Sequence, residues 1–108
     1  MSADNHSVDS ACPDVFSTEC VTAVQRTSED LTRDVQTLRN TPPPNCMQRG
    51  GDDLSDALQS YDADTKRLLS ALRDHDANGV NNVNPVRMAD GQRFNDAIDE
   101  LTAESKNC

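Results

Sequence analysis

The residues best suited to chemistry in this chain lie near its middle, in the run DHDANG at positions 74–79. Carboxylate and amide side chains occupy the first, third and fifth positions of a calcium-binding EF-hand loop, and glycine occupies its sharp turn: Asp74, Asp76, Asn78 and Gly79. The twelfth position of such a loop is a bidentate glutamate, whereas this chain has Pro85 there. A weak calcium site in the loop 74–85 is therefore an alternative prediction and not the leading one.

The leading interpretation of the same run is a corner between two helices. Glycine enters the left-handed conformation that follows many helices at no steric cost, so Asn78-Gly79 is predicted to end a helix. His75 lies on the apolar face of that helix, and we expect it to pack at one end of a bundle rather than to act with Asp76 as an acid or base. No nucleophile at a recognised catalytic spacing accompanies it, so an enzymatic function is not predicted.

A second candidate site is an acidic patch near the end of the chain, formed by Asp96, Asp99 and Glu100. Such residues usually form a solvated helix surface, which is the default interpretation. The alternative is a docking surface for a cationic ligand or protein. The net charge of −9 argues against nucleic acid and anionic membranes as partners, because both require an excess of Lys and Arg. No cofactor is predicted.

The cysteines of this 108-residue chain predict two disulfides. They are widely spaced, without the Cys-x-x-Cys pattern of a zinc or redox site: Cys12, Cys20, Cys46 and Cys108. Only 34% of the residues are hydrophobic and none is tryptophan, so the core is small and needs covalent support. Because disulfides form outside the reducing cytosol, we expect a protein secreted to the cell exterior. The polar first residues contain no signal peptide, so we expect that one has been removed.

Apolar periodicity predicts three helices after a flexible polar arm at residues 1–12, with residues 13–108 forming a single domain. The first helix is expected to end at Asn40, before a run of three prolines. Its start is predicted at Ser17, which can serve as an N-cap, with Pro13 as the alternative.

The second helix is predicted to begin after Gly50-Gly51, with Asp52 as its N-cap. The third is predicted to begin at Asn84-Pro85, because asparagine is a good N-cap and proline is favoured at the first helical position. No segment shows the sustained two-residue alternation of a strand, and none approaches the roughly 20 apolar residues of a membrane span. The predicted fold class is all-α, an up-down-up antiparallel three-helix bundle stapled by two disulfides.

Aligning the apolar faces of these helices predicts which side chains meet: Phe16 with His75, Val24 with Leu68 and Phe94, and Val35 with Leu58. The alignment also brings Cys46 and Cys108 to one end of the bundle, which makes them the favoured disulfide. Cys12 and Cys20 lie at the other end. Their pairing requires the later helix start, since a helix from residue 13 would separate them by about 12 Å, beyond the limit of about 7 Å for a disulfide.

The last segment, ADGQRFNDAIDELTAESKNC, resembles the ends of small exported helical proteins and lipoproteins of actinobacteria. Those proteins often close an amphipathic helix with a near-terminal cysteine. The resemblance covers this segment and the general plan, and it implies no particular chemistry. The sequence as a whole therefore predicts a secreted, monomeric, non-enzymatic module that binds an unidentified protein or cationic ligand.

Overall fold

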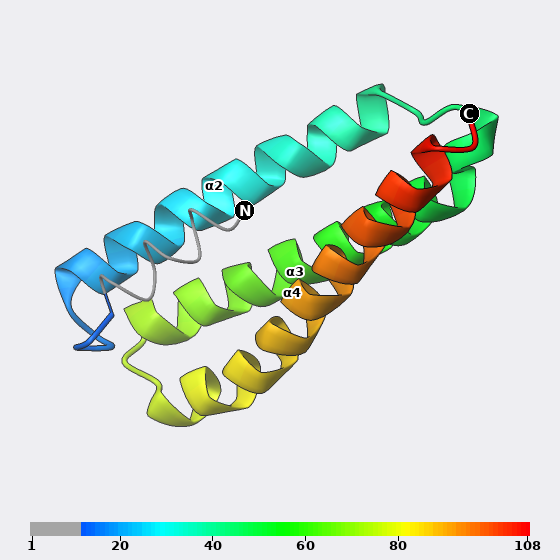
Figure 1. Ribbon diagram of the computed structural model, residues 1–108. Coiled ribbons are helices and arrows are strands. Elements are labelled where there is room, and N and C mark those ends of the chain that lie inside the picture. Colours follow the sequence, from blue (N-terminus) through cyan, green and yellow to red (C-terminus); the bar gives the residue numbers. More distant parts are fainter. Residues whose placement is uncertain (1–11) are drawn as a thin grey trace.

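The computed structural model describes residues 12–108 of the chain (Figure 1). It contains three long helices and one turn of 3-10 helix: α2 (Thr18–Asn40), η1 (Asn45–Met47), α3 (Gln48–Arg73) and α4 (Ala77–Ser105). Successive helices run in opposite directions, and the described residues contain no strand. The predicted all-α three-helix bundle is confirmed. Of the predicted arm, residues 1–11 lie outside the described part.

The start of helix α2 is set by the N-cap residue Ser17 and is compatible with the Cys12–Cys20 disulfide. Ser17 Oγ accepts a hydrogen bond from the backbone N–H of Cys20 at 3.2 Å, which satisfies one of the unpaired N–H groups of the first turn. The later of the two predicted starts is therefore correct. It leaves Cys12 outside the helix and lets it form a disulfide with Cys20 across a Cα–Cα distance of 4.5 Å. The other predicted disulfide, between Cys46 and Cys108, is also present.

Helix α3 begins earlier than predicted, at Gln48, and Asp52 is not its cap. Gly50 and Gly51 lie inside the helix, where an added Cβ at Gly50 would come within 3.0 Å of the Leu101 Cα atom. The glycines therefore serve close packing against a neighbouring segment instead of a turn. The cap comes from α4: Glu104 Oε1 accepts a hydrogen bond from the Gly50 N–H at 2.6 Å.

Replacing Glu104 with alanine should lower the free energy of unfolding by about 1–2 kcal/mol, because it removes the carboxylate that caps α3. Denaturation in urea measures this difference. Asp99→Ala is the matched control, since Asp99 is exposed on the same helix, and it should not lower stability. Equal losses in the two variants would show that Glu104 contributes only as one of many surface charges.

The run DHDANG ends one helix and begins the next, but not at the predicted residues. Helix α3 stops at Arg73, and His75 takes the left-handed conformation with φ of 52°. Asp76 then caps α4, with its Oδ1 accepting a hydrogen bond from the Gly79 N–H at 3.0 Å. The prediction of a helix end at Asn78-Gly79 is wrong. Because Asp76 caps α4, Asn78 and Gly79 lie in the first turn of that helix instead of after the end of α3.

Helix α4 runs straight through Asn84-Pro85, which was predicted to begin it. Proline inside a helix removes one backbone hydrogen bond and costs about 3 kcal/mol. Packing offsets this cost, because the turns before Pro85 bury Val80 against α3 and α2. From Val80 the inward positions recur every seven residues, at Arg87, Phe94 and Leu101, which is the periodicity of helices packed in a bundle.

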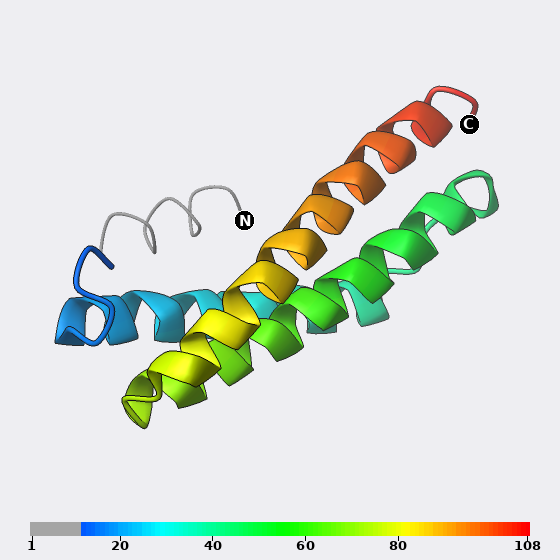
Figure 2. The ribbon, with the colours of Figure 1, turned by 90° about the horizontal axis from the view of Figure 1, so that it is seen from below.

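Helix α3 is the central element of the bundle. It contacts both α2 and α4, whereas the described residues of α2 and α4 have no Cα atoms within 8 Å of each other. Helix α4 crosses α3 at an angle, as the view from below shows (Figure 2). The apolar core consists of two clusters, one near the Cys12–Cys20 disulfide and one nearer the opposite end. The boundary between these clusters lies about midway along α3.

Most of the predicted side-chain neighbours are confirmed. The rings of Phe16 and His75 stack with centroids 5.0 Å apart. Val24 shares the first cluster with Leu68, and Val35 shares the second with Leu58. The placement of Phe94 beside Val24 is wrong, because Phe94 belongs to the second cluster. The early start of α4 moves Phe94 farther along the bundle than a start at Asn84 would.

Candidate functional site

A layer of buried polar residues separates the two apolar clusters. All polar or charged residues that are buried in the described chain belong to it: Thr27, Ser28, Asp64, Thr65 and Arg87. All three helices contribute residues to this layer. In each helix, the inward-facing residues one or two turns before and after the polar residue are apolar. A polar layer in a bundle core costs desolvation energy and fixes which turns of the helices face one another.

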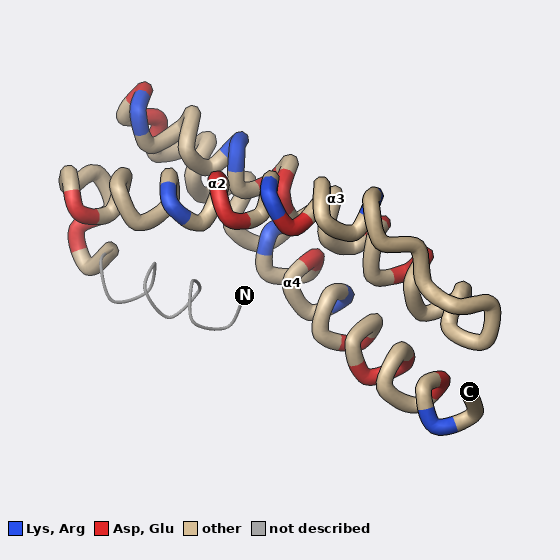
Figure 3. Tube along the Cα trace, turned by 90° about the horizontal axis from the view of Figure 1, so that it is seen from above, with Lys and Arg blue, Asp and Glu red and all other residues tan. Residues whose placement is uncertain are grey.

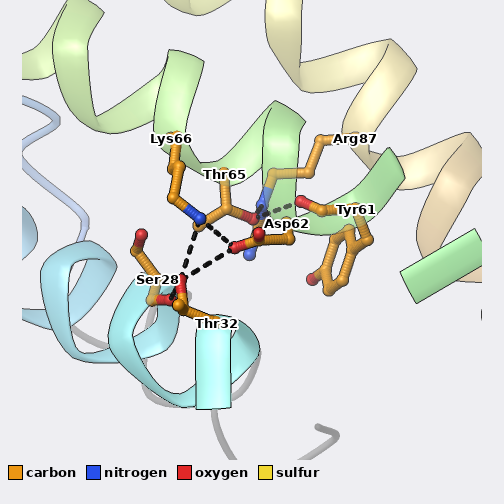
Figure 4. Close-up of polar contacts among 7 residues, drawn as sticks. All are labelled: Ser28, Thr32, Tyr61, Asp62, Thr65, Lys66 and Arg87. Atoms are coloured by element: carbon orange, nitrogen blue, oxygen red, sulfur yellow. Dashed lines mark hydrogen bonds and ion pairs between the residues drawn. The ribbon is translucent and has the colours of Figure 1, made fainter. Parts of the chain in front are cut away.

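Arg87 is the central cation of this layer (Figure 4). Its Nε donates a hydrogen bond to Thr65 Oγ1 at 3.0 Å, and its guanidinium carbon lies 4.7 Å from the ring centroid of Tyr61. The Thr65 hydroxyl in turn donates to the Tyr61 carbonyl at 2.8 Å. These contacts hold the side chain of Arg87 between α3 and α4 at only 9% exposure.

Helix α2 joins the layer at its surface (Figure 4). Lys66 Nζ donates to Thr32 Oγ1 at 2.8 Å and contacts Asp62 Oδ1 at 2.5 Å. Thr32 also donates to Ser28 in its own helix. The ion pair between Asp62 and Lys66 is partly exposed, so it contributes less to stability than the buried contacts.

Two carboxyl groups, on Asp64 and Asp90, meet beside Arg87. Asp64 is 2% exposed, and its Oδ1 lies 3.1 Å from the guanidinium of the largely exposed Arg67. Its Oδ2 is buried without a hydrogen-bond partner. Burial raises the pKa of Asp64 to about 6, with further contributions from a hydrogen bond to Asp90 and from the charge of that carboxylate, while Arg67 and Arg87 act in the opposite direction.

A cavity of about 300 Å³ adjoins the layer on the side of the Cys12–Cys20 disulfide. Its lining is mostly apolar, and α4 contributes the two polar residues Asn84 and Arg87. The complete lining consists of Cys12, Val15, Cys20, Val24, Leu68, Leu72, Val80, Asn84, Arg87 and Met88. Val15 and Met88 are among the few large apolar side chains that are exposed in the described chain. Arg87 therefore belongs both to the polar layer and to the wall of the cavity.

The acidic patch predicted near the end of the chain is only partly assembled. Asp96 and Glu100 line one shallow hollow together with Asp53 and Arg93, whereas Asp99 does not line it. A hydrogen bond with Asp53 raises the pKa of Glu100. Acidic positions recur along the second half of α4 (Figure 3). Two arginines offset part of their charge, because Arg49 of α3 lies 3.5 Å from Glu100 and Arg93 pairs with Asp90.

The residues of the alternative calcium site do not form a loop. Ala77 to Pro85 is helical, so the segment 74–85 provides only three residues of connection between α3 and α4. Across residues 12–108, no three His, Cys, Asp or Glu side chains lie close enough together to hold a metal ion. His75, which was considered as an acid or base, is stacked on Phe16.

The sequence analysis missed Arg87, Asp64 and Asp90. A detectable signal was present, since Arg87 lies seven residues from both Val80 and Phe94 and therefore continues the inward face of α4. The predicted start at Asn84 hid this signal by removing Val80 from the helix.

No family model, curated protein or solved structure matches the chain, so the resemblance to exported actinobacterial proteins stays a prediction. In the part of the chain that the structure describes, no helix is long and apolar enough to cross a membrane.

Proposed function

We propose that this chain is a secreted, non-enzymatic binding protein that holds a small, mostly apolar ligand between α2, α3 and α4. The observation that carries this proposal is the cavity beside the polar layer. Its volume of about 300 Å³ is at the lower end of the range for ligand-binding pockets, and its apolar lining with a few polar groups on one side is typical of them.

The covalent structure supports a location outside the cytosol. Both cysteine pairs form disulfides, and the described chain has no free thiol. Disulfides persist in oxidising compartments, and small cores depend on them most. The disulfide between Cys12 and Cys20 also forms part of the cavity wall, which couples the oxidised state to the shape of the proposed site.

Binding of 1-octanol is the direct test, because this probe is apolar and uncharged. Two-dimensional NMR of the protein should show shifts concentrated at methyl groups of cavity-lining residues such as Val24, Leu72 and Val80, with saturation on titration. Shifts spread evenly over both apolar clusters, or no saturable shifts, would overturn the proposal.

A pair of matched variants sharpens this test. Val15→Asp places a charge at the rim of the cavity, whereas Val86→Asp places the same charge at a similarly exposed valine that does not line it. The first should weaken octanol binding about tenfold, because a charged group would have to be desolvated beside the ligand. The second should change the affinity less than twofold. Equal weakening in both variants would contradict the assignment of the site.

A further inference from the structure

The polar side of the cavity has the character of an anion-binding surface. The polar side chains among its described lining residues are those of Arg87 and Asn84, and no carboxylate is among them. Guanidinium and amide N–H groups are hydrogen-bond donors, and a guanidinium also provides a full positive charge. This contrasts with the chain as a whole, whose net charge is −9.

The charge next to the cavity depends on whether the carboxyl groups of Asp64 and Asp90 hold a proton. The two groups are close enough to share a hydrogen bond, and the buried Asp64 Oδ2 has no partner among the hydrogen-bond donors of the described chain. Two ionised carboxylates have no hydrogen between them and repel each other. One shared proton removes the repulsion and provides the missing hydrogen bond.

The charged groups that act on Asp64 come from two helices. Arg67 lies on α3 with Asp64, while Arg87 and Asp90 approach from α4. Asp90 is itself paired with Arg93 at 3.2 Å. Helix α2 meets this stretch of α3 through Thr32, whose hydroxyl contacts Asp62 and Lys66.

We propose that the cavity binds an amphiphile with an acidic headgroup, and that a proton shared between Asp64 and Asp90 strengthens this binding. The inference rests on the proposed ligand-binding function. With the proton in place, one negative charge faces the two guanidinium groups of Arg67 and Arg87, and the site attracts an anion. When the proton leaves, a second negative charge lies beside these guanidinium groups, and the attraction for an anion weakens. Binding of the acidic ligand is therefore tight in mild acid and weak at alkaline pH.

The experiment compares octane-1-sulfonate with 1-octanol at pH 5 and pH 8. The sulfonate is ionised at both values, so any change in its affinity arises from the protein. We expect the wild-type chain to bind octane-1-sulfonate about five- to tenfold more tightly at pH 5 than at pH 8, the effect of one added charge a short distance away in a partly shielded site. The affinity for 1-octanol should change less than twofold.

Asp64→Asn and Asp90→Asn identify the source of the effect, because each leaves a single carboxyl group in place of the pair. Asp64→Asn should bind octane-1-sulfonate with nearly the same affinity at pH 5 and pH 8. Asp90→Asn should show a smaller pH effect than the wild type, because burial alone still raises the pKa of Asp64. Both variants should bind 1-octanol like the wild type. A pH effect of wild-type size that survives in Asp64→Asn would have another origin and would overturn the inference. If octanol binds normally but octane-1-sulfonate shows no pH dependence in the wild type, the inference alone fails. If neither probe binds, the proposed function fails with it.

Discussion

Replacing both Cys46 and Cys108 with serine is expected to lower the free energy of unfolding by about 4 kcal/mol. These residues are separated by 62 positions, and a cross-link between distant residues removes much conformational entropy from the unfolded chain. The loss is a large part of the stability of an ordinary small domain, which is about 5–15 kcal/mol. Thermal unfolding followed by circular dichroism should show a midpoint lower by at least about 15 °C.

The other disulfide provides the matched comparison. Cys12 and Cys20 are separated by only 8 positions, so replacing both with serine should cost about 2–3 kcal/mol on the same argument. The longer cross-link joins η1, directly before α3, to Cys108 after the end of α4. A smaller loss from the Cys46–Cys108 pair than from the Cys12–Cys20 pair would contradict the entropic argument.

The Asp64→Asn variant is expected to be more stable than the wild type at pH 7.5 by about 1–3 kcal/mol, and to lose this advantage in acid. Burial, the hydrogen bond with Asp90 and the Asp90 charge raise the pKa of Asp64 from 3.8 to about 6. The folded state therefore holds the proton more tightly than the unfolded state. The stabilisation from this proton is complete below about pH 4 and is lost as pH rises through 6.

Asparagine removes this dependence, because it is neutral at every pH and its amide can donate a hydrogen bond to Asp90. It also removes the pair with Arg67, which matters little because Arg67 is 65% exposed. Urea denaturation between pH 4.5 and 8 measures the difference between variant and wild type. Asp56→Asn, a change at an exposed position of α3, is the control and should keep the pH dependence of the wild type. A constant difference between Asp64→Asn and wild type across this range would contradict a shared proton.

The features that follow from local chemistry could be predicted from the sequence. The three-residue and four-residue spacing of apolar side chains indicates helices, and the proline run after Thr41 ends the first of them. Ser17 caps α2 as expected, since a serine side chain and the N–H groups of the next turn are always near each other. The Cys46–Cys108 disulfide followed from the antiparallel order of the helices, because this order brings both cysteines to one end of the bundle. The Cys12–Cys20 pairing also required the later start of α2.

The errors concern residues at which a tertiary contact overrides a local preference. Gly50 lies inside a helix because Glu104, which is 54 residues away in the sequence, caps that helix. Pro85 lies inside α4 because Val80, on the turns before it, is buried between helices. In both cases the local signal is worth one or a few kcal/mol, and packing of a helix face outweighs it.

The sequence by itself determined the helical class, the antiparallel order and the cysteine pairs of this protein. Only the tertiary structure decided the boundaries of α3 and α4, the polar layer around Arg87 and the cavity beside it. The physical reason is the range of the interactions. Caps, proline effects and apolar periodicity act within a few turns of one helix, whereas the environment of Asp64 depends on which turn of α4 faces it. One shift in the start of α4 changes every residue that faces α3, and the proposed ligand site lies at this interface.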